Sequence, residues 1–193
     1  MSIKKILPLI LMVASLQGSA QVIWGLKGGA NVSTLGNSAQ YKPRFGYHVG
    51  TFYSQHIEEQ YGWQIGLQYS LQGARDAVIT DRRLSYHYLS LPLVMKLYFN
   101  GKTFAELGPQ VGYLLNAKSI ETGFEEDLTE AVKSWDFMGL IGMGYETDSG
   151  ASMGLRFGYG FLNTSGGSVG NTVVFRNLLL QLYIGIKLKG FDE

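Results

Sequence analysis

The sequence predicts an all-β protein, an eight-stranded antiparallel up-and-down transmembrane β-barrel. Three observations support this prediction. The segment Tyr61–Gln72 alternates apolar and polar residues without a break, which is the period of a strand, and its length suits a membrane-spanning strand of about 9–11 residues better than a globular strand of about 5–6. After residue 20 there is no run of about 18 apolar residues that would form a spanning helix. The connections between the predicted strands alternate between long and short, as in up-and-down membrane barrels.

The two faces of Tyr61–Gln72 differ in polarity. The odd positions carry aromatic and aliphatic side chains, and the even positions carry glycine, glutamine and serine. From Tyr61 to Tyr69 the strand extends about 26 Å, or roughly 20 Å of depth at the usual tilt, comparable with an apolar band about 25 Å tall. We therefore expect apolar side chains to face lipid and polar side chains to face the lumen.

Residues Met1–Ala20 have the features of a secretory signal peptide. Two lysines precede the apolar run Ile6–Leu16, and small residues end the segment, so cleavage is expected before Gln21. The alternative is a transmembrane anchor, but this run is much shorter than the ~20 residues of a spanning helix. The expected organisation is a signal peptide over residues 1–20 and one barrel domain over residues 21–193.

The composition supports strands and excludes several classes of protein. The chain has 12 Tyr, 10 Phe and 26 Gly but only 4 Pro, which favours an all-β fold rich in turns. A formal net charge of +1 predicts no nucleic-acid partner, for which a concentrated basic stripe is expected. Because there is no cysteine, neither a disulfide framework nor a lipid-modified N-terminal cysteine is expected.

The first four predicted strands show the alternation with varying clarity. Val22–Ser33 opposes tryptophan, leucine, alanine and valine to lysine, asparagine, serine and glycine. Phe45–Ser54 opposes aromatic and β-branched residues to glycine, histidine and serine, with Phe52 on the polar face. Tyr61–Gln72 is the third strand. The fourth, His87–Phe99, opposes leucine and methionine to serine, lysine, tyrosine and proline.

The last four predicted strands continue the pattern. Thr103–Ala117 places leucine, valine and tyrosine on one face and glutamate, glutamine, glycine and Asn116 on the other. Trp135–Thr147 is ambiguous, and placing its aromatic residues outward leaves a methionine and a leucine inside. Ala151–Leu162 opposes methionine, leucine and aromatic residues to serine, arginine and glycine, and Phe175–Leu188 opposes leucine and isoleucine to asparagine, glutamine, tyrosine and lysine.

The connections predict the orientation of the barrel. In barrels of this kind the short turns are periplasmic and the long loops external, so both termini are expected in the periplasm. The long connections are Thr34–Arg44, Gly73–Tyr86, Lys118–Ser134 and Asn163–Val174, and the short ones are Gln55–Gln60, Asn100–Lys102 and Asp148–Gly150.

Turn chemistry predicts the register of one strand pair. A three-residue loop at Asn100–Lys102 places Lys96 opposite Glu106 in the lumen, whereas a two-residue loop would turn Glu106 toward lipid. Pro92 and Pro109 lie inside the same two strands. Because proline removes a ladder donor and marks bulges or edges, a local irregularity is expected at each.

Charged side chains on the inward face form the candidate site. We expect them to pair with one another and plug the lumen, because an unpaired charge in so narrow an interior is costly; the alternative is a proton relay or an ion path. The predicted lumen charge network is Lys27, Lys96, Glu106, Asp136, Glu146, Arg156 and Lys187, with His48 among them. The pair expected to be best defined is Lys96 with Glu106.

Aromatic residues and glycines have separate expected roles. Because an eight-stranded barrel is only just wide enough for its side chains, the inward glycines are expected to make room for Phe52, Tyr88, Phe104 and Tyr183. The predicted lipid-facing girdle is Tyr61, Trp63, Tyr69, Tyr145 and Tyr159.

No catalytic, cofactor or metal site is predicted. His48, His56 and His87 are scattered, and Ser90 lies on the opposite face from His87, so no triad forms; a lipid-modifying barrel enzyme is the alternative. With three scattered histidines and no cysteine, metal-ligand spacing is absent. The loop Lys118–Ser134 is acidic, and the interpretations are a solvated surface or a site for calcium or a basic partner.

The order and spacing of several motifs resemble a known family. They are WGLKGGANVSTL, FGYHVGTFY, GLQYSLQGA, YLSLPLVMKLYF, FAELGPQVGYLL and LRFGYGFLN. Together they are similar to the PorT-like outer-membrane β-barrel domain family and cover essentially the whole chain after residue 20. The resemblance implies an eight-stranded barrel in the outer membrane of a Gram-negative bacterium. It implies little about activity.

Three functions follow from the predicted fold. The first is a non-enzymatic outer-membrane barrel with a structural or surface-interaction role and a plugged lumen; its partners are outer-membrane lipid and a protein partner reached through the external loops. The alternative is a component of transport or protein secretion, as a small pore or as a subunit of a larger machine. The third, a soluble ligand-carrying barrel, is disfavoured because it requires the apolar face inside.

Overall fold

The computed structural model describes residues 22–36, 40–58, 60–79, 81–122, 124–163 and 176–188. The predicted signal peptide, residues 1–20, lies outside them, as does most of the predicted loop Asn163–Val174. Among the described residues, no helix is long and apolar enough to span a membrane.

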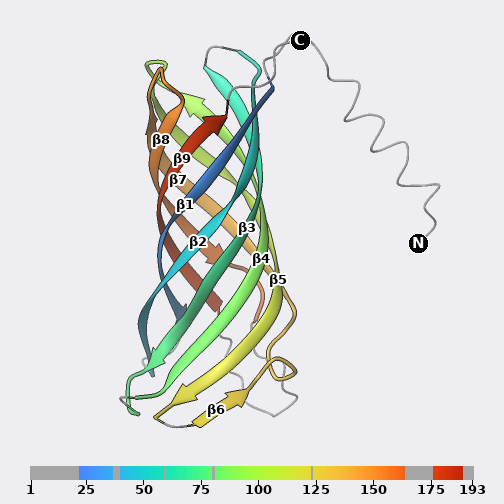
Figure 1. The fold of residues 1–193 in the computed structure, drawn as a ribbon, viewed down its shortest axis with the longest axis vertical. Coiled ribbons are helices and arrows are strands. Elements are labelled where there is room, and N and C mark those ends of the chain that lie inside the picture. Colours follow the sequence, from blue (N-terminus) through green and yellow to red (C-terminus); the bar gives the residue numbers. More distant parts are fainter. Residues whose placement is uncertain are drawn as a thin grey trace, which may run out of the picture.

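Eight long strands close into an antiparallel barrel (Figure 1). Around the barrel the order is β4-β3-β2-β1-β9-β8-β7-β5, and β4 also pairs with β5, which closes the sheet. A short strand, β6, pairs with the end of β5 and with no other strand that the structure describes. The strands are β1 (Val22–Gly36), β2 (Tyr41–His56), β3 (Tyr61–Asp76), β4 (Arg83–Tyr98), β5 (Thr103–Glu121), β6 (Phe124–Asp127), β7 (Trp135–Glu146), β8 (Ala151–Gly160) and β9 (Arg176–Leu188).

The two ends of the barrel differ in their connections. β1 begins and β9 ends at the upper end in Figure 1, and β6 extends from the lower end. The short turns join β2 to β3, β4 to β5 and β7 to β8 at the upper end, where Gly101 and Gly150 adopt φ of 72° and 83°. Such angles favour glycine. By the rule that short turns are periplasmic, we expect the lower end in Figure 1 to be external, and we name the two ends of the barrel accordingly.

The strands extend farther at the external end than the alternation predicts. β3 continues to Asp76 and β4 begins at Arg83, so the strands occupy both ends of the predicted loop Gly73–Tyr86. β5 continues to Glu121 and forms a hairpin with β6 inside the predicted loop Lys118–Ser134. The inward face of these extensions is apolar, because Ala74, Leu84, Tyr86 and Ala117 are buried in one hydrophobic cluster. The polarity therefore no longer alternates there as it does in the middle of the barrel, and the predicted long connections are shorter than expected.

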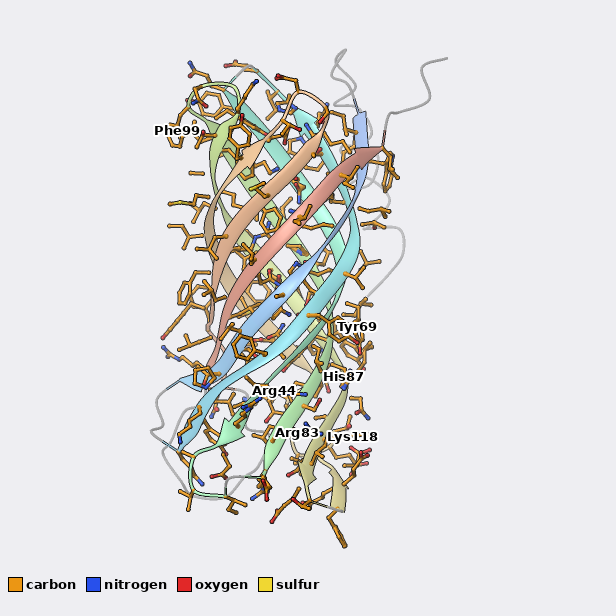
Figure 2. The ribbon with its side chains drawn as sticks, turned by 60° about the vertical axis from the view of Figure 1, so that its left-hand side comes forward. Arg44, Tyr69, Arg83, His87, Phe99 and Lys118 are labelled. Atoms are coloured by element: carbon orange, nitrogen blue, oxygen red, sulfur yellow. The ribbon has the colours of Figure 1, made fainter. Side chains whose placement is uncertain are left out.

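The inward and outward faces have the predicted polarity. Along β3 the side chains of Gln64, Gln68 and Gln72 are buried, whereas Tyr61 and Leu67 are exposed. The same division holds for β7, where the ambiguous Met138 and Leu140 lie in the lumen. The barrel therefore presents its apolar side chains outward and encloses its polar ones (Figure 2).

Inward glycines make room for large rings. A Cβ on Gly25 would overlap the ring of Phe52, and one on Gly144 would overlap Phe104. A Cβ on Gly154 would stand 2.5 Å from the Tyr183 ring and its hydroxyl. These contacts confirm that the glycines offset the bulk of the aromatic residues.

Two register shifts change the facing of strand ends. One lies in β2 between Pro43 and His48, and the other lies in β5, where His87 pairs with Asn116 but Tyr88 pairs with Leu114. Because each shift inserts one residue, it reverses the facing beyond it. Asn116 therefore leaves the lumen, contrary to the prediction, and Ala117 is buried in its place.

The prolines do not disturb the register. On β3 and β4, Ile65 pairs with Leu93 and Gln68 with Ser90, so the offset is the same on both sides of Pro92. The expected irregularity takes the form of a break in the ladder: no residues pair between Ile65–Leu93 and Gln68–Ser90, beside Pro92, or between Pro92–Gln110 and Met95–Leu107, beside Pro109. The bulges instead lie nearer the external ends of the strands.

Candidate functional site

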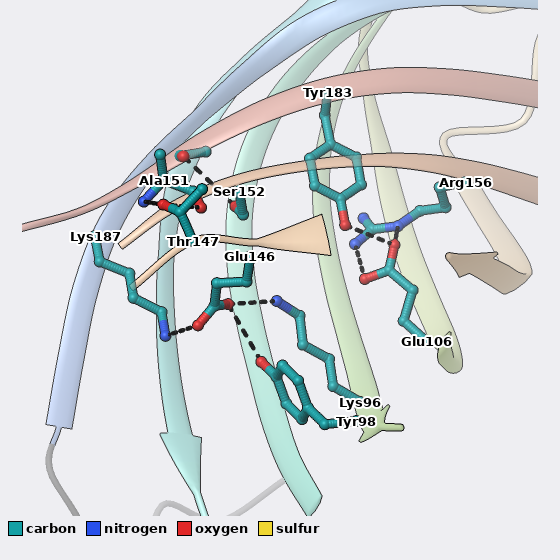
Figure 3. Close-up of polar contacts among 11 residues, drawn as sticks. Lys96, Tyr98, Glu106, Glu146, Thr147, Ala151, Ser152, Arg156, Tyr183 and Lys187 are labelled. Atoms are coloured by element: carbon teal, nitrogen blue, oxygen red, sulfur yellow. Dashed lines mark hydrogen bonds and ion pairs between the residues drawn. The ribbon is translucent and has the colours of Figure 1, made fainter. Parts of the chain in front are cut away.

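A bidentate ion pair crosses the lumen between β5 and β8 (Figure 3). The Arg156 Nε lies 2.8 Å from Glu106 Oε1, and Nη2 lies 2.9 Å from Oε2. The two side chains are 1 % and 0 % exposed. The hydroxyl of Tyr183 donates to Glu106 Oε1 over 3.2 Å. The fork of the guanidinium and the carboxylate thus satisfy each other in the interior.

Gly142 on β7 allows this pair to form. Glu106 lies opposite Gly142, and Gly142 lies opposite Arg156, so the three share one level of the barrel. A Cβ on Gly142 would stand 2.9 Å from Glu106 Oε1. Without a side chain there, the carboxylate and the guanidinium meet directly across β7.

A second cluster surrounds Glu146 nearer the periplasmic end (Figure 3). Lys187 Nζ pairs with Oε1, Lys96 Nζ lies 3.8 Å from Oε2, and the Tyr98 hydroxyl donates to Oε2 over 3.3 Å. Lys96 Nζ also lies 4.2 Å from the centroid of the Phe104 ring. One carboxylate therefore accepts hydrogen bonds from Lys187 and Tyr98 and forms a second, longer ion pair with Lys96.

The predicted pairing of Lys96 with Glu106 is half right. The two residues lie directly opposite each other, which confirms the three-residue turn and the register. Their ion pairs, however, are with other partners, because Glu106 binds Arg156 and Lys96 faces Glu146. Arg156 reaches Glu106 with two parallel hydrogen bonds, a geometry that a lysine cannot provide.

The other two predicted charges form no ion pair among the described residues. Lys27 is buried with its Nζ 3.9 Å from the centroid of the Tyr183 ring and 5.4 Å from that of Phe52, a cation–π arrangement. Asp136, toward the external end, accepts a hydrogen bond from Asn177 Nδ2 over 2.7 Å. The structure thus joins five of the predicted charges in ion pairs and holds the other two by different contacts.

Tyr183 connects the lumen groups and was predicted only as a bulky side chain. Its hydroxyl binds Glu106, while its ring faces Lys27 and lies 5.3 Å from the Arg156 guanidinium carbon. A tyrosine on the polar face of an otherwise aliphatic strand is the signal in the sequence that marks it. His48 Nδ1 lies 2.7 Å from Asn31 Oδ1, and Asn31 is four residues farther than Lys27 along β1 toward the external end.

The predicted girdle residues all lie on the outward face, at two levels. Tyr61, Trp63 and Tyr145 lie on the periplasmic side, and Tyr69 and Tyr159 on the external side. Further outward ring pairs extend these bands, with centroid separations of 5.4, 5.2 and 5.0 Å. They are Trp24–Tyr53, Tyr53–Trp63 and Tyr113–Trp135.

One histidine on the outer surface has a serine partner that the sequence analysis missed. His87 Nδ1 contacts the Tyr69 hydroxyl, and Ser85 Oγ lies 3.4 Å from His87 Nε2. These side chains are two residues apart on one strand and therefore share a face. Within the described ranges His87 has no carboxylate partner, so the acid of a triad is missing. No group of three or more potential metal ligands occurs in the described part of the chain.

Comparison with known proteins identifies a family model and structural relatives. The sequence matches the model described as "Outer membrane protein beta-barrel domain" over residues 16–166. No curated protein sequence gives a significant match. The crystal structure of Neisserial surface protein A is similar, with a TM-score of 0.60 and 11 % identity, over 86 % of this chain and 97 % of that one. Ail, the attachment invasion locus protein of Yersinia pestis, is also similar, with a TM-score of 0.52 and 14 % identity, over 87 % and 99 %. These likenesses are likenesses of fold.

Proposed function

This chain belongs to the outer membrane protein beta-barrel domain family, and from that membership we propose a non-enzymatic role for it. It is a small eight-stranded β-barrel of the bacterial outer membrane. The proposed role is structural or one of surface interaction, with a lumen closed by its own side chains. We further propose that it is a PorT-like member, because its motifs occur in the order of that group.

The Arg156–Glu106 ion pair is the observation that best supports the proposal of a closed lumen. The two side chains come from β8 and β5, bridge over Gly142 and are almost completely buried. Tyr183 fills the space beside them. An ion passing this level would have to displace a bidentate salt bridge between two almost completely buried side chains, and breaking a buried ion pair is costly.

Conductance in a planar bilayer tests this proposal. The purified wild-type barrel is expected to show no steady channel, whereas Arg156→Ala with Glu106→Ala is expected to conduct. The matched control is Leu155→Ala with Leu107→Ala, on the same two strands but facing lipid. Steady channels of equal size in the wild type and in the lumen variant would refute the closed lumen.

The surface-interaction part of the proposal is supported by the external end. There β5 and β6 form a hairpin, and Phe124 at its tip is 80 % exposed. A protease specific for glutamate, added to intact cells, is expected to cut between Glu121 and Glu130. Protection of this hairpin together with cleavage in lysed cells would mean that the orientation is reversed.

A transport role is the second candidate, and one observation favours it. Several buried lumen atoms have no hydrogen-bond partner among the described residues: Lys27 Nζ, His48 Nε2, Ser54 Oγ and Gln64 Oε1. Such groups are commonly satisfied by ordered water. A hydrated path would produce the wild-type conductance that the first proposal excludes, so the same experiment distinguishes the two.

A further inference from the structure

The two bulges turn cations onto the outer surface at the external end. In the unbroken alternation, Lys42 and Lys118 have the parity of lumen residues such as His48 and Gln110. The register shifts in β2 and β5 reverse this. Lys42 becomes exposed opposite Arg75, and Lys118 becomes half-exposed opposite Ser85.

Together with β3 and β4, these residues form what we call the basic rim: Lys42, Arg75, Arg83 and Lys118. Lys42 lies directly opposite Arg75, and Arg75 directly opposite Arg83. Like charges opposite one another across strands are destabilising. Within the described ranges, the side chains of Lys42, Arg75 and Arg83 make no hydrogen bond or ion pair. Lys118 alone of the basic rim pairs with an acid, Glu125, at 3.1 Å.

A fifth cation adds to the charge of the rim. Arg44 Nη1 donates to the carbonyls of Gln72 and Leu84 over 3.1 and 2.8 Å. It lies over Gly73, where a Cβ would stand 3.2 Å from Nη1 and where φ is 139°. Both the conformation and the space thus favour glycine at this position. Arg44 is therefore fixed by backbone carbonyls, which leave its positive charge uncompensated.

The basic rim lies just beyond the lipid-facing surface of the same strands. Arg83 and Lys118 lie farther toward the external end than Tyr69 and His87 (Figure 2). Arg75 follows the outward Leu71 by four residues, which is about 13 Å along the strand and roughly 9 Å of depth. The interfacial layer of a bilayer is about 5–8 Å thick on each side. An arginine side chain can span the difference.

A surface hollow of about 400 Å³ marks the same place. Arg75, Arg82 and Arg83 line it, and Ser119 fixes Arg82 by accepting from Nε over 3.1 Å. Asp81 and Glu121 also line the hollow, yet neither forms an ion pair with these arginines among the described residues. The hollow therefore offers several guanidinium donors at the level of lipid headgroups.

We propose that the basic rim binds phosphate groups of the outer-leaflet lipids. Guanidinium groups bind phosphate by two parallel hydrogen bonds, and a phosphate between Arg75 and Arg83 would relieve the repulsion of two facing cations. The aliphatic and aromatic outer surface next to the basic rim, on its membrane side, would contact the acyl chains of the same lipid. This inference does not depend on whether the lumen conducts.

The test compares thermal unfolding of the full barrel in nanodiscs. The discs contain phosphatidylcholine alone or with phosphatidic acid, and a third sample adds inorganic phosphate to phosphatidylcholine discs. The test variant is Arg75→Gln with Arg83→Gln. The control with the same change in net charge is Lys102→Gln with Lys133→Gln, away from the rim; Lys133 is exposed, and Lys102 is half-exposed in a surface ion pair with Asp148 at 2.6 Å. Unfolding is followed by the gel-mobility difference between folded and boiled protein.

Phosphatidic acid is expected to raise the unfolding midpoint of the wild type and of the control, and to raise that of the rim variant much less. The affinity of phosphatidic acid for the rim variant, measured by titration in micelles, should be about three- to tenfold weaker than its affinity for the wild type. In phosphatidylcholine alone the rim variant should be at least as stable as the wild type, because it lacks the facing charges. An equal rise in all three proteins, or a rise produced by inorganic phosphate alone, would overturn the proposal.

Discussion

Removing Arg156 should destabilise the barrel more than removing both members of its ion pair. In the variant Arg156→Met, Glu106 keeps a buried carboxylate with only the Tyr183 hydroxyl as hydrogen-bond donor among its present partners. A buried ion pair broken on one side typically costs about 3–5 kcal/mol. The equilibrium constant for unfolding should therefore rise by about two to four orders of magnitude.

The double variant Arg156→Met with Glu106→Leu should recover this loss. Replacing a buried pair by apolar residues of similar volume is often neutral or stabilising by about 1–4 kcal/mol. The hydroxyl of Tyr183 would then lack its acceptor, which costs about 1–3 kcal/mol, so we expect the double variant to lie close to the wild type. Adding Tyr183→Phe to it should be neutral or stabilising, because this removes the stranded hydroxyl.

Urea unfolding of the refolded barrel in detergent micelles measures these differences, with the folded fraction read from gel mobility. Leu155→Ala is the matched control, on the same strand as Arg156 but facing lipid. If the single and double variants lose equal stability, the pair does not hold the lumen together as described. If Arg156→Met costs no more than Leu155→Ala, the pair is not buried.

Three further predictions concern the lumen, the hairpin and the outer surface. Gly144→Ala should cost about 1–3 kcal/mol in urea unfolding, because its Cβ would overlap the Phe104 ring; unchanged stability would mean that the ring lies elsewhere. The hydroxyl and N–H of Thr129 hold the pKa of Asp127 below its ordinary value. The Asp127 carboxylate therefore stabilises the hairpin fully above the ordinary pKa, and this stabilisation is lost as pH falls through the lowered pKa. Amide-exchange protection at Thr129 should drop in acid in the wild type but not in Asp127→Asn. Brominated acyl chains should quench the tryptophan fluorescence, since Trp63 and the other two tryptophans face outward; unquenched emission would place them inside.

Strand facing was predictable wherever the alternation is unbroken. In β3 every second side chain from Gly62 to Gln72 is buried, because a pleated strand offers no other choice once one face is apolar. The turn at Asn100–Lys102 similarly determined that Lys96 lies opposite Glu106.

The prediction of which side chains face the lumen was wrong beyond each bulge, where one residue is inserted. Beyond Leu114 the alternation of β5 reverses, and Asn116 is directed away from the lumen. Lys42 changes face in the same way. An inserted residue leaves no clear mark in composition, since lysine and asparagine are acceptable on either side of a strand end near water.

The ion-pair partners of the lumen charges could not be predicted from the sequence either. Glu106 and Arg156 are separated by β7 and meet only because Gly142 lies between them. Whether Glu106 and Arg156 lie at the same height in the barrel depends on the register of β5 against β7. These two strands are joined by the long segment that contains β6. Turn chemistry determines the register across a short loop but not across that connection.

The position of β6 has a consequence for crowding in the membrane. Among the described residues β5 is its only partner, which leaves one row of backbone donors and acceptors of β6 without a strand partner in that part of the chain, and such an edge invites pairing with another strand. Glu125, Glu126 and Asp127 occupy three of its four positions. Two copies that approached edge to edge would bring these carboxylates together, and their repulsion keeps neighbouring barrels from joining into a continuous sheet.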